Sequence, residues 1–144
     1  MFDRILLVCT GNICRSPLAE ALLKKKLPGR TVLSAGTSAL VGEPADALAV
    51  ETGKAHGLDL SDHRAQQATR LNLFHSDLIL ALDGGHYEWI LSHCPELRGR
   101  VFKLGRWNGD KDVADPFRHP REAFEEAFER IEEFTESWMS RLGR

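Results

Sequence analysis

Residues 9–16 read CTGNICRS, and they stand between an apolar run, ILLV at 5–8, and a proline at position 17. A short, continuous apolar run is typical of a strand that is covered on both faces. Pro17 suits the first position of a helix, and Ser16 before it is a common helix cap. The stretch therefore predicts a strand over residues 4–8, a tight loop and a helix that begins at Pro17.

The remainder of the chain alternates between strand and helix patterns in the same way. Strands are expected at residues 31–34, 77–82 and 101–104, and helices at 17–27, 44–57, 65–73, 86–94 and from Pro120 onward. In the last helix, apolar residues spaced three and four apart predict one packed face, formed by Phe124, Phe128, Ile131, Phe134 and Trp138. The alternation predicts an α/β fold in a single domain, residues 1–144, with a parallel sheet that helices cover on both faces.

Composition narrows the classes of function. A chain of 144 residues with 42% hydrophobic content is long enough for one core, and a net charge of −2 with one short lysine run at 24–26 does not indicate a nucleic-acid partner. The sequence has neither a signal-peptide pattern nor an apolar stretch long enough to span a bilayer, so we expect no membrane insertion and a cytoplasmic location. Cys9, Cys14 and Cys94 are an odd number of cysteines, which favours reduced thiols over a disulfide framework.

The loop after the first strand has the features of a phosphate site. In parallel sheets, ligands bind beyond the carboxyl ends of the strands, and Cys9 stands there. A loop that enters a helix can aim several N–H groups at one anion; Gly11 permits close backbone approach, Asn12 tolerates a left-handed conformation, and Arg15 can offer a bidentate fork. The same donors stabilise a thiolate, and Ser16 can donate a hydrogen bond to it. Cys9 is therefore a predicted nucleophile at neutral pH.

Hydrolysis of a phosphate monoester needs a nucleophile, neutralisation of the phosphate oxygens and a proton for the leaving oxygen. Cys9, the loop with Arg15, and Asp115 are the predicted suppliers. An Asp before Pro is often only a turn former, and it is the cysteine loop that favours a catalytic role for Asp115. We expect no metal and no cofactor, because the six histidines include no pair with helical metal-site spacing.

Residues Cys9–Ser16 match the signature of the low-molecular-weight protein tyrosine phosphatases, and the likeness covers nearly the whole chain. Other segments that resemble the family are Ser34-Ala35-Gly36-Thr37, Asp62-His63, Asp83 and Asp115-Pro116-Phe117. The resemblance implies a four-stranded parallel sheet flanked by helices and a reaction that passes through a phosphocysteine. It implies a phosphotyrosine protein as the partner.

In detail the chain is most similar to bacterial members that are partnered with tyrosine kinases of exopolysaccharide production. The segments that carry this narrower likeness are Leu40-Val41-Gly42, Arg106-Trp107 and Arg121-Glu122-Ala123-Phe124. The implied substrate is an autophosphorylating tyrosine kinase. The family's phosphorylatable tyrosines beside the acid are missing, since Phe117 follows Pro116 and Tyr87 is the only tyrosine.

The other predicted site residues bind the substrate or support the loop. Predicted contacts with the phosphate or its ester come from Thr10, Gly11, Asn12, Ile13, Cys14 and Ser16. Leu40 and Phe117 are candidate walls for an aromatic ring, although a loop Leu is often local packing. The resemblance implies that Ser34 and His63 hydrogen-bond Asn12; the alternative is a capped loop Ser and a surface His. The family usually has Arg three residues after that His, where this chain has Gln66, so a charge role there stays open.

Three alternative functions compete. An arsenate reductase of the same fold relays a disulfide through two further cysteines, whereas Cys94 stands alone. An arginine phosphatase has Thr in place of Ile13, and an apolar side chain suits an aryl ring better. A phosphate-binding module without turnover would lack one of Cys9, Arg15 and Asp115, and all three are present. The sequence therefore favours hydrolysis of phosphotyrosine.

Overall fold

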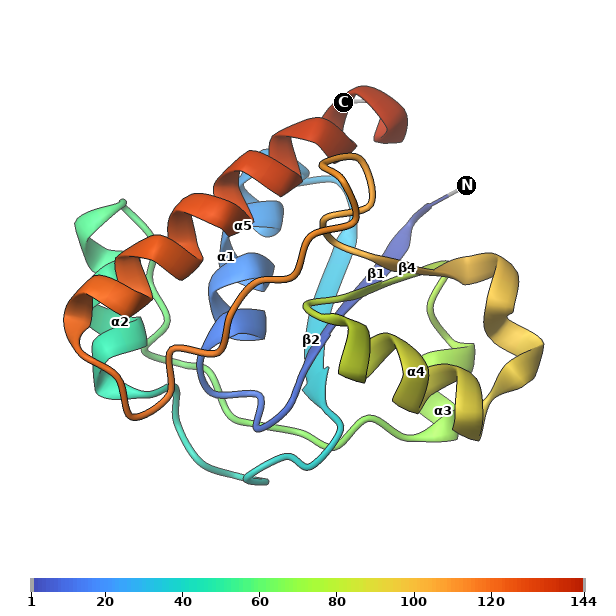
Figure 1. Ribbon diagram of the computed structural model, residues 1–144, viewed down its shortest axis with the longest axis horizontal. Helices are drawn as coiled ribbons and strands as arrows, with labels where there is room; N and C mark the ends of the chain where they lie inside the picture. Colours follow the sequence, from blue (N-terminus) through green and yellow to red (C-terminus); the bar gives the residue numbers. More distant parts are fainter. Residues whose placement is uncertain (1, 144) are drawn as a thin grey trace.

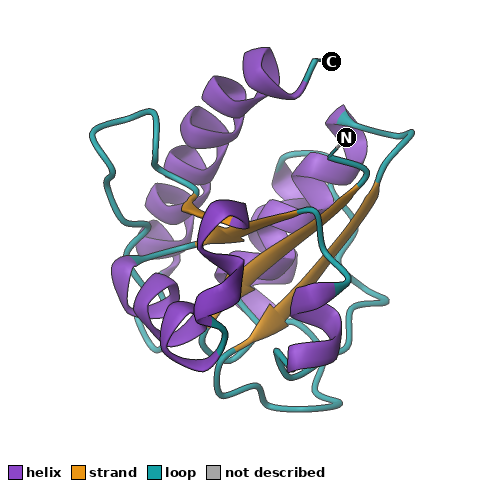
Figure 2. Ribbon diagram, turned by 90° about the vertical axis from the view of Figure 1, so that its right-hand side faces the viewer, coloured by secondary structure: helices purple, strands orange, loops and turns teal. Residues whose placement is uncertain are grey.

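The four strands of the structure pair in parallel, as the apolar runs predict, and helices lie on both faces of the sheet (Figures 1 and 2). The computed structural model describes residues 2–143. The strands are β1 (Arg4–Cys9), β2 (Thr31–Gly36), β3 (Leu78–Ala81) and β4 (Val101–Lys103), in the order β2-β1-β3-β4. The helices are α1 (Arg15–Lys26), α2 (Ala47–Ala55), α3 (Arg70–Phe74), α4 (Gly84–His93), the short 3₁₀ helix η1 (Pro95–Arg100) and α5 (Arg121–Leu142).

Side chains of β1 alternate between the two faces of the sheet. Ile5, Leu7 and Cys9 belong to the core cluster that includes the buried faces of α1 and α5. Leu6 and Val8 belong to the second cluster, on the side of α3, α4 and η1. All five side chains are at most 2% exposed, so β1 is covered on both faces as its apolar run predicts. This alternation fixes the face on which the Cys9 thiol lies.

The apolar stripe of the last helix is core packing, as predicted. Phe124, Phe128, Ile131, Phe134 and Trp138 are all buried in the cluster under α5. The indole N–H of Trp138 donates to the carbonyl of Leu104 at 2.8 Å. The helix therefore covers one face of the sheet and takes no part in the site.

The predicted helix over 65–73 is wrong for its first half, because only α3, from Arg70, is helical. Residues before α3 are extended, and Gln67 forms a bridge with Gly36 at the end of β2. The Gly36 N–H donates to the Gln66 carbonyl at 2.9 Å, and the Ala68 N–H donates to the Gly36 carbonyl at 2.8 Å. Pairing with the sheet edge overrides the helical propensity of this stretch.

Three predicted helix starts are also wrong. Helix α4 begins at Gly84 rather than at His86, because the Asp83 side chain caps it by accepting the His86 N–H at 3.1 Å. The second helix begins at Ala47 rather than at Pro44, because the Asp46 side chain caps it by accepting the Leu48 N–H at 2.9 Å. The first helix begins at Arg15, so Ser16 lies within its first turn and is not its cap. Strand β2 runs two residues longer than predicted, β3 is shorter by one residue at each end, and η1 was not expected.

The order of the strands places the first loop at a topological switch point. The chain passes from β1 through α1 to β2 on one side, and then returns through α2 and α3 to β3 on the other side of β1 (Figure 1). The crevice at the carboxyl end of β1 is where ligands bind in such sheets. No helix in the described part of the chain combines the length and apolar character that crossing a membrane requires.

Gly36 is expected to tolerate no side chain. A Cβ there would overlap the Thr10 carbonyl oxygen and lie 3.1 Å from the Asn12 nitrogen, both of them backbone atoms of the first loop. We expect Gly36→Ala to lower the free energy of unfolding by about 1–3 kcal/mol and to reduce activity, because the loop must shift. Gly29→Ala, which meets nothing within 4 Å, is the matched control. Equal urea midpoints for the two variants would contradict this packing argument.

Candidate active site

A cavity of about 190 Å³ opens at the carboxyl end of β1. Its walls come from the first loop, from the segment after β2 and from the segment before α5. The lining residues are Cys9, Thr10, Gly11, Ile13, Cys14, Arg15, Ser38, Leu40, Asp115 and Phe117. All of them except Ser38 are residues that the sequence predicts for the site. The Ser38 N–H donates to the Thr10 carbonyl at 3.0 Å, and no sequence pattern marks this residue.

Asn12 holds the loop from behind. Its φ is 60°, in the left-handed region, and its side chain is fully buried. The Asn12 Nδ2 donates to Ser16 Oγ at 2.8 Å and to Ser34 Oγ at 2.9 Å. Its Oδ1 accepts the Gln66 N–H at 2.9 Å, and its carbonyl lies 2.6 Å from His63 Nε2. Every polar group of this side chain is therefore used to fix the strained turn.

These contacts set the direction of the hydrogen bond to Cys9. An amide NH₂ can only donate, so the Ser16 hydroxyl accepts from Asn12 and has its own hydrogen left to donate. The Cys9 Sγ lies 2.8 Å from Ser16 Oγ, and both side chains are buried. Ser16 is thus poised to donate its hydrogen to the Cys9 sulfur.

Two of the predicted contact residues do not line the cavity. The side chains of Asn12 and Ser16 face the interior, where they support the loop and the sulfur. Gln66, at the position where the family usually has Arg, also gives neutral support: its Nε2 donates to the Ser34 carbonyl at 2.9 Å. At this position the neutral amide of Gln66 supports the loop, and no charged side chain is present.

Arg15 joins three parts of the chain while it is itself only 2% exposed. Its Nη1 donates to Asp83 Oδ2 and to the Val113 carbonyl, both at 2.8 Å. Its Nη2 lies 3.7 Å from Asp115 Oδ2. The Nε is buried and has no hydrogen-bond partner within the described residues. The Nε–Nη2 edge is therefore the part of the guanidinium that fits two oxygens of an anion.

Asp83 keeps the arginine in this orientation. Burial works to raise the pKa of Asp83, but the hydrogen bonds from the Arg15 guanidinium and from the His86 backbone N–H, together with the charge of Arg15, outweigh it, so the pKa lies below its ordinary value. Asp83 is thus ionised at neutral pH and forms a charge-assisted pair with Arg15. Burial raises the pKa of the Cys14 thiol, which stays protonated beside the loop and is not a second nucleophile.

Asp115 lies at the rim, with its side chain half exposed. Its Oδ1 accepts the Phe117 N–H at 3.0 Å, which orients the carboxyl group toward the cavity that it lines. Leu40 and Phe117 are partly exposed apolar walls, and Ile13 completes the apolar lining. The Arg118 guanidinium lies 5.3 Å from the centre of the Phe117 ring, against its face.

His86 is a residue of the site that the sequence analysis missed. It is buried at the start of α4, where its Nδ1 accepts the Asp83 N–H at 3.2 Å and its Nε2 lies 2.8 Å from Thr10 Oγ1. Nδ1 is thus an acceptor, so the proton of the neutral ring is on Nε2 and is donated to Thr10. The available signal was the spacing Asp83-x-x-His86, a capping box.

Within residues 2–143, no group of three or more His, Cys, Asp or Glu side chains is arranged to hold a metal ion. The donors that surround the cavity are instead the loop, a helix N-terminus and one guanidinium. Such donors suit a phosphate-sized anion. A thiol at its base and a carboxyl group at its rim add a nucleophile and a proton carrier.

Comparisons with known proteins agree with this geometry. The family model described as low molecular weight phosphotyrosine protein phosphatase matches residues 4–144. The probable low molecular weight protein-tyrosine-phosphatase EpsP of Ralstonia nicotianae is 49% identical over 142 residues, which cover 99% of this chain and 97% of EpsP. The structure of Vibrio vulnificus Wzb in complex with benzylphosphonate superposes with a TM-score of 0.94 at 43% identity, covering 98% of this chain and 99% of Wzb.

A further similar structure is the YwlE arginine phosphatase of Geobacillus stearothermophilus. It superposes with a TM-score of 0.91 at 37% identity, covering 96% of this chain and 92% of YwlE. The fold alone therefore does not separate phosphotyrosine from phosphoarginine as a substrate.

The neutral state of His86 predicts a pH dependence of stability. Burial lowers the pKa of His86 from 6.5 to about 4, with Asp83, Asp115 and Asp112 working against this and Arg15 adding to it. Between these pH values the unfolded chain binds the proton and the folded chain does not, so stability falls as the pH falls. We expect a loss on the order of 2 kcal/mol between pH 7 and pH 5 from this group.

His86→Gln removes the titration but keeps an acceptor and a donor, so its unfolding free energy should change less over this range than that of the wild type. His119→Gln, at an exposed position, is the control and should keep the wild-type slope. Urea unfolding at pH 5, 6 and 7 measures the three curves. Parallel curves for His86→Gln and the wild type would rule out this origin.

Proposed function

The chain belongs to the low molecular weight phosphotyrosine protein phosphatase family and is a protein-tyrosine phosphatase, and from this premise we propose that it works through a phosphocysteine on Cys9. The observation that carries the proposal is the meeting of Cys9, Arg15 and Asp115 around one cavity with apolar walls. Cys9 and Arg15 come from the first loop and Asp115 from the segment before α5, and together they fulfil the three requirements of phosphoryl transfer.

In the first step the Cys9 thiolate attacks phosphorus, an S–P bond forms, and the bond from phosphorus to the tyrosyl oxygen breaks. Asp115 gives its proton to that oxygen, so tyrosine leaves as a neutral phenol. The Nε–Nη2 edge of Arg15 and the loop amides bind the equatorial oxygens, where charge is concentrated in the transition state. Ser16 supports this step by its contact with the sulfur, which lies 2.8 Å away.

In the second step water attacks the phosphocysteine. Asp115, now ionised, takes a proton from the water, an O–P bond forms and the S–P bond breaks. The electron pair of that bond returns to Cys9 as a thiolate, which the Ser16 hydroxyl stabilises as a leaving group. Inorganic phosphate is then released. The groups that neutralise its charge are the loop amides and Arg15.

The walls of the cavity support an aryl ester as the substrate. Ile13, Leu40 and Phe117 offer apolar surface between the rim and the sulfur. The related Wzb of Vibrio vulnificus was solved with benzylphosphonate, which joins an aromatic ring to a phosphonate. A long phosphotyrosine reaches Cys9 through such walls, whereas a phosphoserine is too short.

The alternatives are weaker on specific grounds. The YwlE arginine phosphatase is a structural neighbour, but the cavity here offers the apolar Ile13 where a hydroxyl would suit a guanidinium. For a disulfide relay, Cys94 would have to approach Cys9. Cys94 is fully buried in the core cluster on the opposite face of the sheet.

We propose further that the phosphotyrosine protein is an autophosphorylating tyrosine kinase of polysaccharide production and that the enzyme is cytoplasmic. The likeness at residues 40–42, 106–107 and 121–124 supports the partner, as do the matches to EpsP and Wzb. All three cysteines are free thiols in the structure, which supports a reducing compartment.

The proposed function predicts that a phosphotyrosine peptide is hydrolysed without added metal and that EDTA has no effect, because backbone amides and Arg15 neutralise the phosphate. Phosphoserine and phosphoarginine versions of the same peptide should be hydrolysed at least about a hundredfold more slowly. Phosphate release measures all three. Comparable phosphoserine turnover would contradict the inference that only a long phosphotyrosine reaches Cys9. Faster phosphoarginine turnover would show that the enzyme is an arginine phosphatase instead.

A further prediction concerns Asp115, the proposed proton donor. Asp115→Asn should lower kcat for the phosphotyrosine peptide by about 10²-fold or more, because the leaving oxygen loses its acid. Its inhibition by inorganic phosphate should be nearly unchanged. Asp110→Asn, on the same segment and with a positive φ that Asn tolerates, is the control. An Asp115→Asn enzyme with wild-type kcat would remove Asp115 from the mechanism.

A further inference from the structure

The hydroxyl of Ser34 has only one direction left for its hydrogen. Ser34 Oγ accepts from Asn12 Nδ2 at 2.9 Å, and the residue is 2% exposed. Its hydrogen therefore needs a protein acceptor, since a buried hydroxyl without one is costly. That acceptor is the Glu20 carboxylate, whose Oε1 lies 2.5 Å from Ser34 Oγ.

Glu20 stands on α1 and is linked to Asn12 through Ser34, whereas the Cys9 sulfur is linked to Asn12 through Ser16. Its side chain is only 14% exposed, and its second oxygen, Oε2, lies 2.6 Å from the Lys24 ammonium. An unbroken series of contacts leads from the carboxylate inward: Glu20 Oε1 to Ser34 Oγ, to Asn12 Nδ2, to Ser16 Oγ, to Cys9 Sγ. Each donor and acceptor along it has a fixed role.

We propose that Glu20 is a positioning residue for catalysis, which acts through Ser34 and Asn12 on the loop that binds phosphate. With its hydrogen on Glu20, the Ser34 oxygen presents lone pairs to Asn12. Without that acceptor, the Ser34 hydroxyl can turn its hydrogen toward the Asn12 NH₂ group, where two donors would face each other. The hydrogen bond between Asn12 and Ser34 is then weakened, and the strained turn loosens. Ser16 then loses the contact that directs its own hydrogen toward Cys9.

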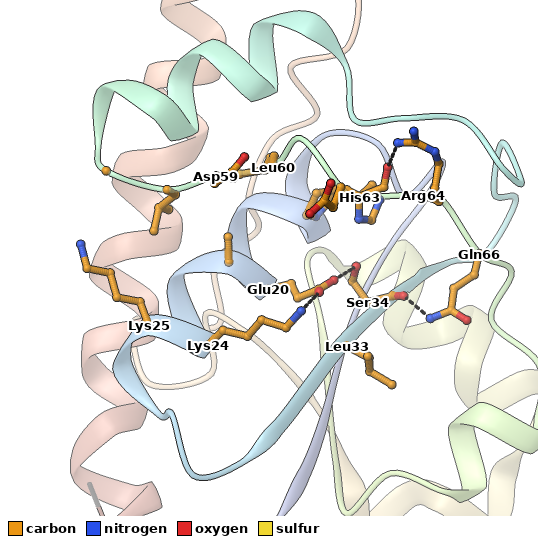
Figure 3. A pocket seen from close by; sticks show the side chains of 15 residues that line it. Glu20, Lys24, Lys25, Leu33, Ser34, Asp59, Leu60, His63, Arg64 and Gln66 are labelled. Atoms are coloured by element: carbon orange, nitrogen blue, oxygen red, sulfur yellow. Dashed lines mark hydrogen bonds and ion pairs between the residues drawn. The ribbon is translucent and has the colours of Figure 1, made fainter.

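The Glu20 carboxylate can be reached from solvent, which makes the inference testable. It lines a second cavity, of about 560 Å³, between α1, β2 and the segment before α3. Figure 3 shows Glu20 and Lys24 reaching from α1 toward Ser34, with Gln66 on the other side of that serine. A small carboxylate that enters this cavity after removal of the Glu20 side chain can accept the Ser34 hydrogen in its place.

The experiment compares Glu20→Ala with Glu20→Gln, which keeps an oxygen acceptor. We expect Glu20→Ala to lose about tenfold in kcat/KM for a phosphotyrosine peptide and to bind inorganic phosphate about three- to tenfold more weakly. Its alkylation by iodoacetate should slow by a similar factor, because the sulfur loses support from Ser16. Glu20→Gln should stay within about twofold of the wild type in all three.

Chemical rescue separates positioning from a general loss of structure. Acetate should raise the kcat/KM of Glu20→Ala at least about threefold, after correction for its effect on the wild type. Two controls isolate the hydrogen bond. Lys24→Ala removes only the exposed ion pair, and Glu51→Ala removes another helix glutamate, which pairs with Arg121 at 2.9 Å. Both should remain within about twofold of the wild type and should not respond to acetate.

The inference rests on the proposed phosphocysteine chemistry, but phosphate binding and alkylation report on the loop without turnover. A wild-type enzyme without activity would refute the function and not this assignment. An active wild type with an unchanged Glu20→Ala variant would refute the assignment alone. Equal losses in Glu20→Gln and Glu20→Ala, or a Lys24→Ala variant as impaired as Glu20→Ala, would also overturn it.

Discussion

The site depends on one left-handed residue, Asn12, and on the hydrogen bonds that hold it. A non-glycine residue at φ 60° is strained, and it persists only when its surroundings over-determine it. Here they do: two hydroxyls, one backbone N–H and one imidazole use every polar group of the side chain and its carbonyl. Because the turn is fixed, the sulfur, the helix N-terminus and the guanidinium can share one small cavity.

Arg15 connects this turn to the rest of the sheet. It reaches from the start of α1 to Asp83 after β3 and to the Val113 carbonyl. The carboxyl ends of neighbouring parallel strands meet at one edge, so residues far apart in the sequence become neighbours around a single guanidinium. The carboxylate of Asp83 takes one side of the guanidinium, which leaves Nε and Nη2 for an anion. Asp83 thus orients the Arg15 guanidinium so that its free edge can bind an anion such as phosphate.

The sequence predicts the parts of this molecule whose signals are local. The two-sided burial of β1 follows from its apolar run, and the face of α5 follows from its spacing. Cys9, Arg15 and Asp115 are predicted site residues because hydrolysis of a phosphate ester requires a nucleophile, a cation and an acid, and the structure brings all three around one cavity. The extended stretch around Gln67 was missed, since a bridge to Gly36 overrides local propensity. Contacts at long sequence separation, such as His86 with Thr10, leave no periodic trace.

Neutral groups matter to this site as much as charged ones. A protonated His86 would lose the acceptor at Nδ1 that binds the Asp83 N–H, and its extra charge would compete with Arg15 for the same carboxylate. An ionised Cys14 would place a negative charge within the loop that surrounds the cavity. Burial keeps both groups uncharged, because it penalises the charged form of each. The loop can therefore concentrate its positive potential on one sulfur and one anion, which is the condition that the proposed thiolate chemistry on a phosphate ester requires.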